Sequence, residues 1–322
     1  MRSTCSAKKP DVMQPQLLAL TPFYAPTLAA LERDYVLHKL WQAPDASAWM
    51  QQIAPAVRGI VTTGLLGCTR AHIDALPKLE IIACFGTSHG SLDLAAAKER
   101  GIVVTNTPDW TVDAVADLAV GLLIAVMRRI NEADRFIRAG KWPAGAFPMS
   151  TDLRGKTCGI IGYGGIGRAV AQRVAAFGMA VIYHGPREKP GVAHPYYADL
   201  AQMAQASDCL IVTCPETPAT RKSVDARILD ALGPRGFLVN VARGAIVDEA
   251  ALLEALQQGR IAGAGLEVFW DEPRVPAALL ALEQVVLAPH IGSSTREIRE
   301  HRGATLLANL RAHFEPVASR LA

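Results

Sequence analysis

Length, composition and charge exclude several classes of protein. The chain has 322 residues, half of them hydrophobic and 20% charged, which is the composition of a globular protein with about two domains. The formal net charge of +3 gives no electrostatic reason to expect a nucleic-acid partner. The longest apolar stretch, residues 118–127, is too short to span a bilayer, and the N-terminus lacks the apolar region of a secretory signal. We therefore expect a cytoplasmic protein without a membrane partner.

The cysteines point to the same compartment. None of the six has the Cys-x-x-Cys spacing of zinc or redox sites, so no metal site is predicted. Several lie in apolar, strand-like runs, where a reduced thiol behaves as a small hydrophobic side chain. Reduced cysteines are typical of cytoplasmic proteins.

Strand-like and helix-like segments alternate from Gln16 onward. Strands are predicted over residues 17–23, 57–62, 79–84 and 102–105, and helices over residues 26–34, 70–76 and 92–100. Short connections between alternating strands and helices indicate a mostly parallel sheet with helices on both faces.

A long helical pattern follows over residues 111–138. Its apolar face is wider than a surface helix needs, so this helix either lies in the core or meets a partner subunit. A second alternating series runs over residues 157–289, and one last helix is predicted over residues 294–314. These segments predict an α/β protein with two doubly wound, Rossmann-like domains built on parallel sheets.

A glycine-rich loop opens the second series. Gly162, Gly164 and Gly167 form G-x-G-x-x-G directly after a predicted strand and at the start of an alanine-rich helix. In this context the first glycine permits the turn, the second lets a pyrophosphate approach the backbone, and the third lets helix and strand pack closely. The helix N-terminus then favours the phosphates. The loop predicts dinucleotide binding; the alternative is a structural glycine turn.

The end of the next strand bears on the choice of dinucleotide. An acid about 20 residues after the glycines would hold the ribose 2′-hydroxyl of NAD, but this strand ends at His184-Gly185 without one. The nearest acid is Glu188, and Arg187 with Lys189 could attract a 2′-phosphate. This favours NADPH, with NADH as the second choice. The alternative is that Arg187 is an ordinary solvated arginine and selectivity is weak.

A polar cluster at residues 240–244 ends a later strand. Open α/β sheets bind ligands at the carboxyl ends of their strands, and a guanidinium there can hold a carboxylate through two hydrogen bonds. Arg243 is therefore a candidate for binding a substrate carboxylate. The alternative is a structural ion pair with Asp248 or Glu249.

Carboxylates and a histidine follow two further strands. Glu267, Asp271 and Glu272 come after one strand, and His290 comes after the next. A histidine beside a carboxylate can be held protonated near neutral pH and can deliver a proton. With Arg243, these groups predict acid–base chemistry on an acidic substrate.

At these residues the chain resembles the D-isomer-specific 2-hydroxyacid dehydrogenase family. The resemblance runs from about Pro15 to Phe314, and four motifs of the family occur in order: G-x-G-x-x-G, N-V-A-R-G, V-F-x-x-E-P and P-H-x-G-S. Within the family the chain is most similar to the glyoxylate/hydroxypyruvate reductase and hydroxyphenylpyruvate reductase branch. The resemblance implies NADPH-preferring reduction of small 2-oxo acids, such as glyoxylate and hydroxypyruvate, to D-2-hydroxy acids.

The resemblance also implies roles for individual residues. Arg243 binds the substrate carboxylate and polarises the 2-oxo group, His290 protonates the nascent alkoxide, and Glu272 pairs with His290 and favours its charged form. The implied cofactor-binding residues are Gly162, Tyr163, Gly164, Gly165, Ile166, Gly167, His184, Gly185, Arg187, Cys214, Pro215, Thr220, Val241, Ala242, Glu267 and Gly292. The implied substrate-binding residues are Leu66, Gly67, Phe85, Gly86, Thr87, Arg243 and His290.

The chain departs from the family's pattern at two single residues and in one loop. Gly165 stands where the family often has an arginine beside the pyrophosphate, and Glu267 replaces an aspartate that contacts the nicotinamide amide. Residues 88–93 differ from the usual substrate loop. None of these departures touches the three catalytic residues.

The resemblance further implies a discontinuous substrate domain. We expect that domain at residues 1–104 with the helix of residues 292–322, the cofactor domain at residues 105–291, and the active site in the cleft between them. Residues 111–140 resemble the family's dimer arm and predict a homodimer, in which Trp142 either reaches the partner's pocket or packs in the interface. Two alternatives stay open: another 2-hydroxy acid (D-lactate, a phenylpyruvate or a sugar acid), or a non-catalytic nucleotide sensor of the same fold.

Overall fold

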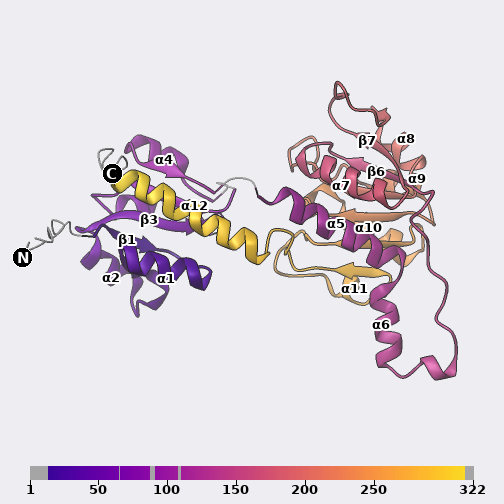
Figure 1. The fold of residues 1–322 in the computed structure, drawn as a ribbon, viewed down its shortest axis with the longest axis horizontal. Helices are drawn as coiled ribbons and strands as arrows, with labels where there is room; N and C mark the ends of the chain where they lie inside the picture. Colours follow the sequence, from indigo (N-terminus) through magenta and orange to yellow (C-terminus); the bar gives the residue numbers. More distant parts are fainter. Residues whose placement is uncertain (1–13, 65, 88–90, 108–109, 316–322) are drawn as a thin grey trace, which may run out of the picture. The chain divides into compact units, whose positions relative to one another are not determined.

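The computed structural model describes residues 14–64, 66–87, 91–107 and 110–315, which belong to two compact units. Unit 1 consists of residues 1–109 and 296–322, and unit 2 consists of residues 110–295. Each unit is built on one sheet whose strands all pair in parallel, with five strands in unit 1 and seven in unit 2 (Figure 1). The prediction of two α/β domains with parallel sheets is confirmed.

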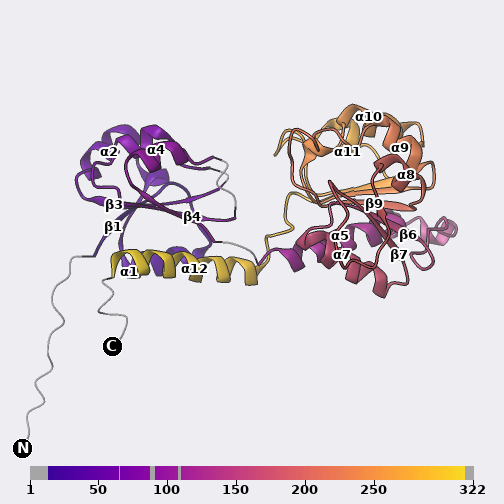
Figure 2. The ribbon, with the colours of Figure 1, turned by 90° about the horizontal axis from the view of Figure 1, so that it is seen from above.

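The sheet of unit 1 has the strand order β2-β1-β3-β4-β5. Its strands are β1 Gln16–Ala19, β2 Val36–Lys39, β3 Val57–Thr63, β4 Ile81–Phe85 and β5 Val103–Thr105. Its helices are α1 Ala25–Asp34, α2 Ala46–Ile53, α3 Arg70–Asp74, α4 Leu94–Glu99 and α12 Arg296–Phe314, with a short 3₁₀ turn η1 at Leu40–Gln42. Helices α1 and α12 cover one face of the sheet, and α2 and α4 cover the other (Figure 2).

Side-chain alternation along the strands divides the core of unit 1 into two layers. Leu18, Ile60 and Ile82 belong to one buried cluster. Their neighbours on the other face of the sheet, among them Leu17 and Ile81, pack with Leu306 and Leu310 of α12. The last helix is therefore an integral part of the core of unit 1.

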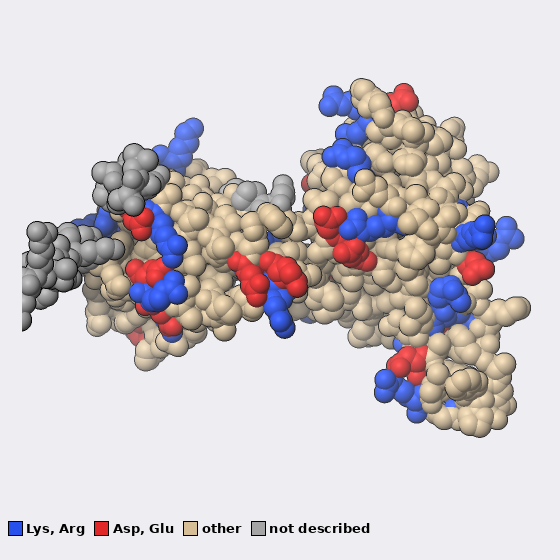
Figure 3. Space-filling view, viewed as in Figure 1, with Lys and Arg blue, Asp and Glu red and all other residues tan. Residues whose placement is uncertain are grey.

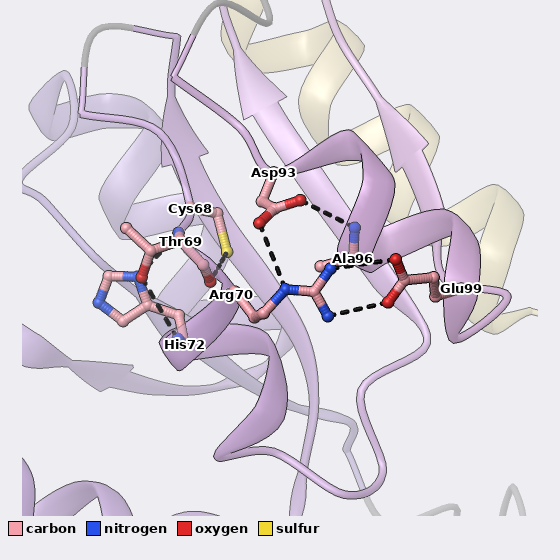
Figure 4. Close-up of polar contacts among 7 residues, drawn as sticks. All are labelled: Cys68, Thr69, Arg70, His72, Asp93, Ala96 and Glu99. Carbon is pink, nitrogen blue, oxygen red and sulfur yellow. Dashed lines mark hydrogen bonds and ion pairs between the residues drawn. The ribbon is translucent and has the colours of Figure 1, made fainter.

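Two loops of unit 1, after β3 and before α4, are held together by backbone and side-chain contacts. Cys68 N–H donates to Ser91 O at 3.1 Å, and Asp93 N–H donates to Cys68 O at 2.9 Å. Arg70 on α3 binds both carboxylate oxygens of Glu99, at 2.8 and 3.1 Å, and lies 3.7 Å from Asp93 (Figure 4). Because these ion pairs are exposed, they position the loops more than they stabilise the unit.

The sheet of unit 2 has the strand order β12-β11-β10-β9-β6-β7-β8. Its strands are β6 Thr157–Ile161, β7 Ala180–His184, β8 Tyr196–Tyr197, β9 Cys209–Val212, β10 Phe237–Asn240, β11 Gly263–Leu266 and β12 Val285–Leu287. The chain moves to one side from β6 to β7 and to the other side at β9. This reversal of direction lies at the carboxyl ends of β6 and β9, the place where doubly wound sheets bind ligands.

Helices cover both faces of this sheet (Figure 2). Helices α5 Val112–Met127 and α7 Gly165–Ala176 lie on one face. Helices α8 Leu200–Gln205, α9 Ala226–Leu232, α10 Glu249–Gln257 and α11 Ala277–Leu280 lie on the other, and 3₁₀ turns occur at η2 Trp142–Ala144 and η3 Gly244–Ile246.

The single long helix predicted over residues 111–138 is wrong. The structure has two helices there, α5 and α6 Ile130–Arg138, because Arg129 adopts a left-handed conformation with φ of 54°. Helix α5 is buried against the sheet and α7, whereas α6 has no buried residue and extends away from the body of unit 2 (Figure 1). The apolar pattern continued past the break, so it did not reveal the change of direction.

Three predictions from composition, about membrane spans, cysteines and charge, can be compared with the structure. In the described part of the chain, no helix is both long and apolar enough to cross a membrane. The described cysteines, five in number, are buried and form no disulfide with one another, whereas Cys5 lies outside the described residues. On the face drawn in Figure 3, basic side chains are interspersed with acidic ones.

Candidate active site

The glycine loop of unit 2 joins β6 to α7 with little room for side chains. Gly162 has φ of 96°, and a Cβ there would lie 2.6 Å from the Cα of Cys214. A Cβ on Gly167 would overlap the carbonyl oxygen of Gly162. Gly164 is the N-cap of α7, and a Cβ there would meet nothing within 4 Å. Two glycines are thus needed for the fold, and the third opens the backbone to a ligand at a helix N-terminus.

Neighbouring strand ends support this loop. Thr213, directly after β9, donates its hydroxyl to Gly162 O at 2.6 Å. Tyr163 packs on Tyr183 with ring centroids 4.6 Å apart. Thr220 closes the following loop by donating its hydroxyl to Pro215 O at 2.8 Å. The residues that would hold a dinucleotide thus fit that ligand: the glycine loop is fixed by its neighbours and leaves an open helix N-terminus for a pyrophosphate.

The segment after β7 is fixed by tyrosines. The hydroxyl of Tyr196 donates to Gly185 O at 3.0 Å, and Lys189 N–H donates to the hydroxyl of Tyr183 at 2.8 Å. His184 Nδ1 lies 2.9 Å from the carbonyl oxygen of Tyr197. Within the described chain the exposed Arg187 makes no hydrogen bond or ion pair. Its guanidinium is therefore available to a ligand beyond the carboxyl end of β7.

Arg243 is presented by a braced turn after β10. The buried side chain of Asn240 accepts a hydrogen bond from Ala242 N–H at 3.0 Å and donates to Arg243 O at 3.0 Å. The Arg243 side chain is exposed and donates to Ala242 O at 2.6 Å. The ion pair considered above as an alternative is absent from the described residues, since Asp248 caps α10 and pairs with Lys222 at 3.2 Å.

His290 and Glu272 form a direct pair. His290 Nδ1 lies 2.6 Å from Glu272 Oε2, and Glu272 Oε1 accepts from Phe269 N–H at 3.0 Å. His290 is one of few non-glycine residues with a positive φ, 52°, which its backbone N–H stabilises by donating to Glu267 O at 2.9 Å. With Nδ1 bound to the carboxylate, Nε2 is left to face a reactant.

Glu267 lies between these groups. Its side chain is buried, Oε1 accepts from Gly292 N–H at 3.1 Å, and Oε2 is buried without a hydrogen-bond partner. Burial raises the pKa of Glu267, while the Gly292 N–H and the charge of His290 oppose that rise. The charges of Glu272 and Arg243 also affect the pKa of Glu267, so these two residues, His290 and Glu267 lie near one another. An unpartnered buried oxygen is suited to an N–H donor such as a carboxamide.

Unit 1 contributes the other predicted residues on two loops. Gly67 has φ of 74°, and a Cβ there would overlap the backbone of Ser91. Gly86 N–H donates to Thr107 Oγ1 at 2.9 Å, and Thr107 N–H donates back to Gly86 O at 3.0 Å. The exposed Thr87 N–H has no acceptor among the described residues, which makes it a free donor on this loop. Residues 88–90, part of the same predicted loop, lie outside the described residues.

Comparison with known proteins identifies the family. The family described as D-isomer specific 2-hydroxyacid dehydrogenase, NAD binding domain, matches residues 120–292. Glyoxylate/hydroxypyruvate reductase A of Arabidopsis thaliana is 44% identical over 88% of this chain and 91% of its own. The chain belongs to the D-isomer-specific 2-hydroxyacid dehydrogenases. The protein is therefore an oxidoreductase that uses a nicotinamide cofactor, and the predicted family is confirmed.

Other members of the family extend the likeness. 2-Ketogluconate reductase of Gluconobacter oxydans is 42% identical over 94% of this chain and 96% of its own. Among solved structures, an NADPH-dependent glyoxylate/hydroxypyruvate reductase from Sinorhizobium meliloti in complex with NADP and malonate is 42% identical, with a TM-score of 0.81 and 94% of both chains covered. The likeness thus extends over nearly the whole chain.

Two elements of this dehydrogenase's site were missed by the sequence predictions. Asn240 was noted only as part of a motif, although its buried amide braces the turn that carries Arg243. The backbone N–H of Phe269, which holds Glu272, has no sequence signal. A buried asparagine at a strand end could have suggested the first, because buried amides are hydrogen-bonded.

Proposed function

We propose that the protein reduces glyoxylate, hydroxypyruvate or a related small 2-oxo acid to the D-2-hydroxy acid with NADPH, in the cytoplasm. The observation that carries the proposal is the His290–Glu272 pair, 2.6 Å apart, in one electrostatic neighbourhood with the unpaired Arg243. A proton donor and a free guanidinium match what reduction of a 2-oxo carboxylate needs. Unit 1 is proposed as the substrate domain and unit 2 as the cofactor domain.

The proposed mechanism assigns one task to each group. Arg243 binds the carboxylate through parallel N–H groups and draws electrons from the 2-oxo group. The nicotinamide, when bound, supplies the hydride. His290 Nε2–H gives its proton to the oxygen that becomes the hydroxyl, and Glu272 holds the ring through Nδ1. Glu267, whose buried Oε2 has no hydrogen-bond partner among the described residues, would accept a hydrogen bond from the cofactor's carboxamide.

Contacts from unit 1 complete the proposal. We assign binding of the substrate to Leu66, Gly67, Phe85, Gly86 and Thr87. Of these, the free N–H of Thr87 supports a role in holding the carboxylate, whereas the N–H of Gly86 already donates to Thr107. The half-exposed side chain of Leu66 supports a role in contacting the rest of the substrate.

We expect Arg187→Ala to raise the KM for NADPH by at least about tenfold, while the KM for NADH changes little, because only NADPH carries a 2′-phosphate for the guanidinium to bind. The measurement is steady-state kinetics with both cofactors. Arg235→Ala is the matched control. Arg235 is also exposed, but it precedes β10 and so lies at the amino ends of the strands, whereas Arg187 follows the carboxyl end of β7. Equal effects of Arg187→Ala on both cofactors would make Arg187 an ordinary solvated residue.

A specific likeness favours a second substrate class. The 2-ketogluconate reductase is nearly as similar as the glyoxylate/hydroxypyruvate reductase, at 42% against 44% identity. A panel of 2-oxo acids ranked by kcat/KM, with NADH and NADPH side by side, separates small 2-oxo acids from sugar acids. A protein that binds NADPH but reduces none of them would be a nucleotide sensor.

We also propose that the protein is a homodimer, as residues 111–140 predict, and that the contact is made by the projecting arm, which in the structure comprises residues 128–150. Its exposed apolar side chains include Ile130, Ile137, Trp142 and Met149, the last 95% exposed. So many exposed apolar groups on one projection favour burial against a second copy. Trp142 is itself 64% exposed, which suits either packing in the interface or a contribution to the partner's pocket.

Ile137→Glu is expected to convert the dimer to a monomer, because it places a charge in a desolvated apolar interface. Light scattering coupled to size-exclusion chromatography measures the mass. Phe177→Glu, an exposed apolar position on the C-cap of α7, is the control and should leave the dimer intact. A monomeric native protein would show the arm proposal to be wrong.

A further inference from the structure

One arginine of α12 lies where the helix otherwise buries apolar side chains. Ile298, Leu306 and Leu310 are 4%, 0% and 0% exposed, and they lie four or eight residues from Arg302. Positions spaced by four share one face of a helix, so Arg302 lies in the stripe that α12 turns toward the sheet of unit 1. A cation in that stripe needs an explanation, since charged residues are rarely buried unless paired.

Arg302 has no anion to pair with in the described part of the chain. It makes no hydrogen bond or ion pair with any residue that the structure describes, although the other arginines of α12 include one, Arg311, that pairs with Asp34 at 2.6 Å. Its charged neighbour is instead Arg299. Burial lowers the pKa of Arg302 most, and the positive charge of Arg299 lowers it further. Partial exposure leaves the side chain within reach of a solute.

The two arginines meet the sheet at the carboxyl end of β4. The guanidinium of Arg299 lies over the ring of Phe85, 6.0 Å from its centroid. Arg302 interacts electrostatically with Cys84, the residue before Phe85. The Phe85–Thr87 loop, which we propose binds the substrate, leaves the sheet at this point. Positive charge therefore gathers in unit 1 beside the proposed substrate loop.

We propose that Arg302, with Arg299 beside it, is an anion subsite that binds a second carboxylate, so that the preferred substrates are 2-oxo dicarboxylates. The inference rests on the proposed function and names its substrate class. A partly buried cation without a counter-ion is stabilised when an anion binds beside it, and a guanidinium binds a carboxylate through two hydrogen bonds. A neutral tail of the same length gains neither contact.

The test compares two substrates of equal chain length, 2-oxoglutarate and 2-oxopentanoate, in the full-length enzyme. The native enzyme should prefer 2-oxoglutarate by kcat/KM. Arg302→Met should lower the ratio of the two kcat/KM values by at least about tenfold, the loss expected for one charge-assisted contact. Methionine suits a stripe of apolar neighbours, so the variant should fold, which its Tm checks. Arg302→Lys keeps the charge and should recover part of the ratio.

Arg296→Met is the matched control. Arg296 lies on the same helix, is exposed and carries the same charge, so its loss reports any long-range effect of charge alone. The control should change the ratio less than twofold, or about 0.4 kcal/mol. A native enzyme without preference for the dicarboxylate, or an Arg302→Met ratio equal to the native one, overturns the proposal. An equal loss for both substrates would make Arg302 merely structural.

A second measurement separates this inference from the proposed function. The rise in Tm with 2-oxoglutarate, against that with 2-oxopentanoate, reports binding without turnover. If neither substrate is reduced with either cofactor, the proposed function fails. The subsite still stands if 2-oxoglutarate raises the Tm of the native protein and not that of Arg302→Met, and it fails if the two proteins respond alike.

Discussion

His290→Ala is expected to lower kcat by about 10²–10⁴-fold, because it removes the group that delivers a proton in the transition state. Arg243→Ala should cause a loss of similar size and also raise the KM for the 2-oxo acid, since the guanidinium both binds the carboxylate and polarises the reacting carbonyl. Neither residue belongs to the glycine loop between β6 and α7. Cofactor binding, measured by fluorescence titration with NADPH, should therefore persist in both variants.

Glu272→Gln tests the pair more finely. The amide has the size of the carboxylate, but it carries no charge to favour a protonated His290, so kcat should fall without loss of fold. Asp271→Asn is the control, because the adjacent Asp271 is exposed and pairs only with Arg274 among the described residues. Near-normal turnover in both His290→Ala and Arg243→Ala would contradict the proposed mechanism.

Gly164→Ala should separate cofactor binding from folding. The new methyl group meets nothing within 4 Å in the protein, so the Tm should stay within a few degrees of the native value. It occupies the open space in front of the α7 N-terminus, where a pyrophosphate must approach the backbone. We expect the Kd for NADPH to rise by at least about tenfold, which corresponds to about 1.4 kcal/mol.

Two other glycines calibrate that result. Gly162→Ala strains a residue with φ of 96° and drives a methyl group to 2.6 Å from Cys214, so it should lower the Tm as well as the affinity. Gly121→Ala, on the exposed face of α5 with open space around it, should change neither. An unchanged Kd in Gly164→Ala would argue against pyrophosphate binding at this loop.

Local patterns were enough to predict much of the fold. The strand, glycine loop and helix around Gly162 were predictable because a short turn, a tight contact and an open helix end each require glycine at a fixed spacing. The alternation of apolar strands and helices likewise predicted two parallel sheets. The edge strand β2 and helix α2 carried no prediction, because β2 lacks a clear apolar alternation and is only partly buried.

The remaining features depend on tertiary contacts. The break between α5 and α6 occurs at one residue, Arg129, which is left-handed and whose guanidinium lies over the ring of Phe147, 5.0 Å from its centroid. The hydrogen bonds of Asn240 are local, to Ala242 and Arg243, but its burial depends on strands distant in sequence. The buried position of Glu267 likewise depends on Gly292, 25 residues further along the chain. Sequence could name Arg243, Glu272 and His290 through a resemblance, whereas the 2.6 Å contact within the last pair required the folded chain.

The place of α12 in unit 1 sets the order in which the protein can mature during synthesis. The sheet of unit 1 is complete once Thr105 has been made, but the face bearing Leu17 and Ile81 is covered only when Leu306 and Leu310 arrive. The whole of unit 2 is translated in between, at about 5–20 residues per second. The first unit to leave the ribosome is therefore the last to finish folding. For roughly ten seconds or more its uncovered apolar face is exposed, and a chaperone can bind it.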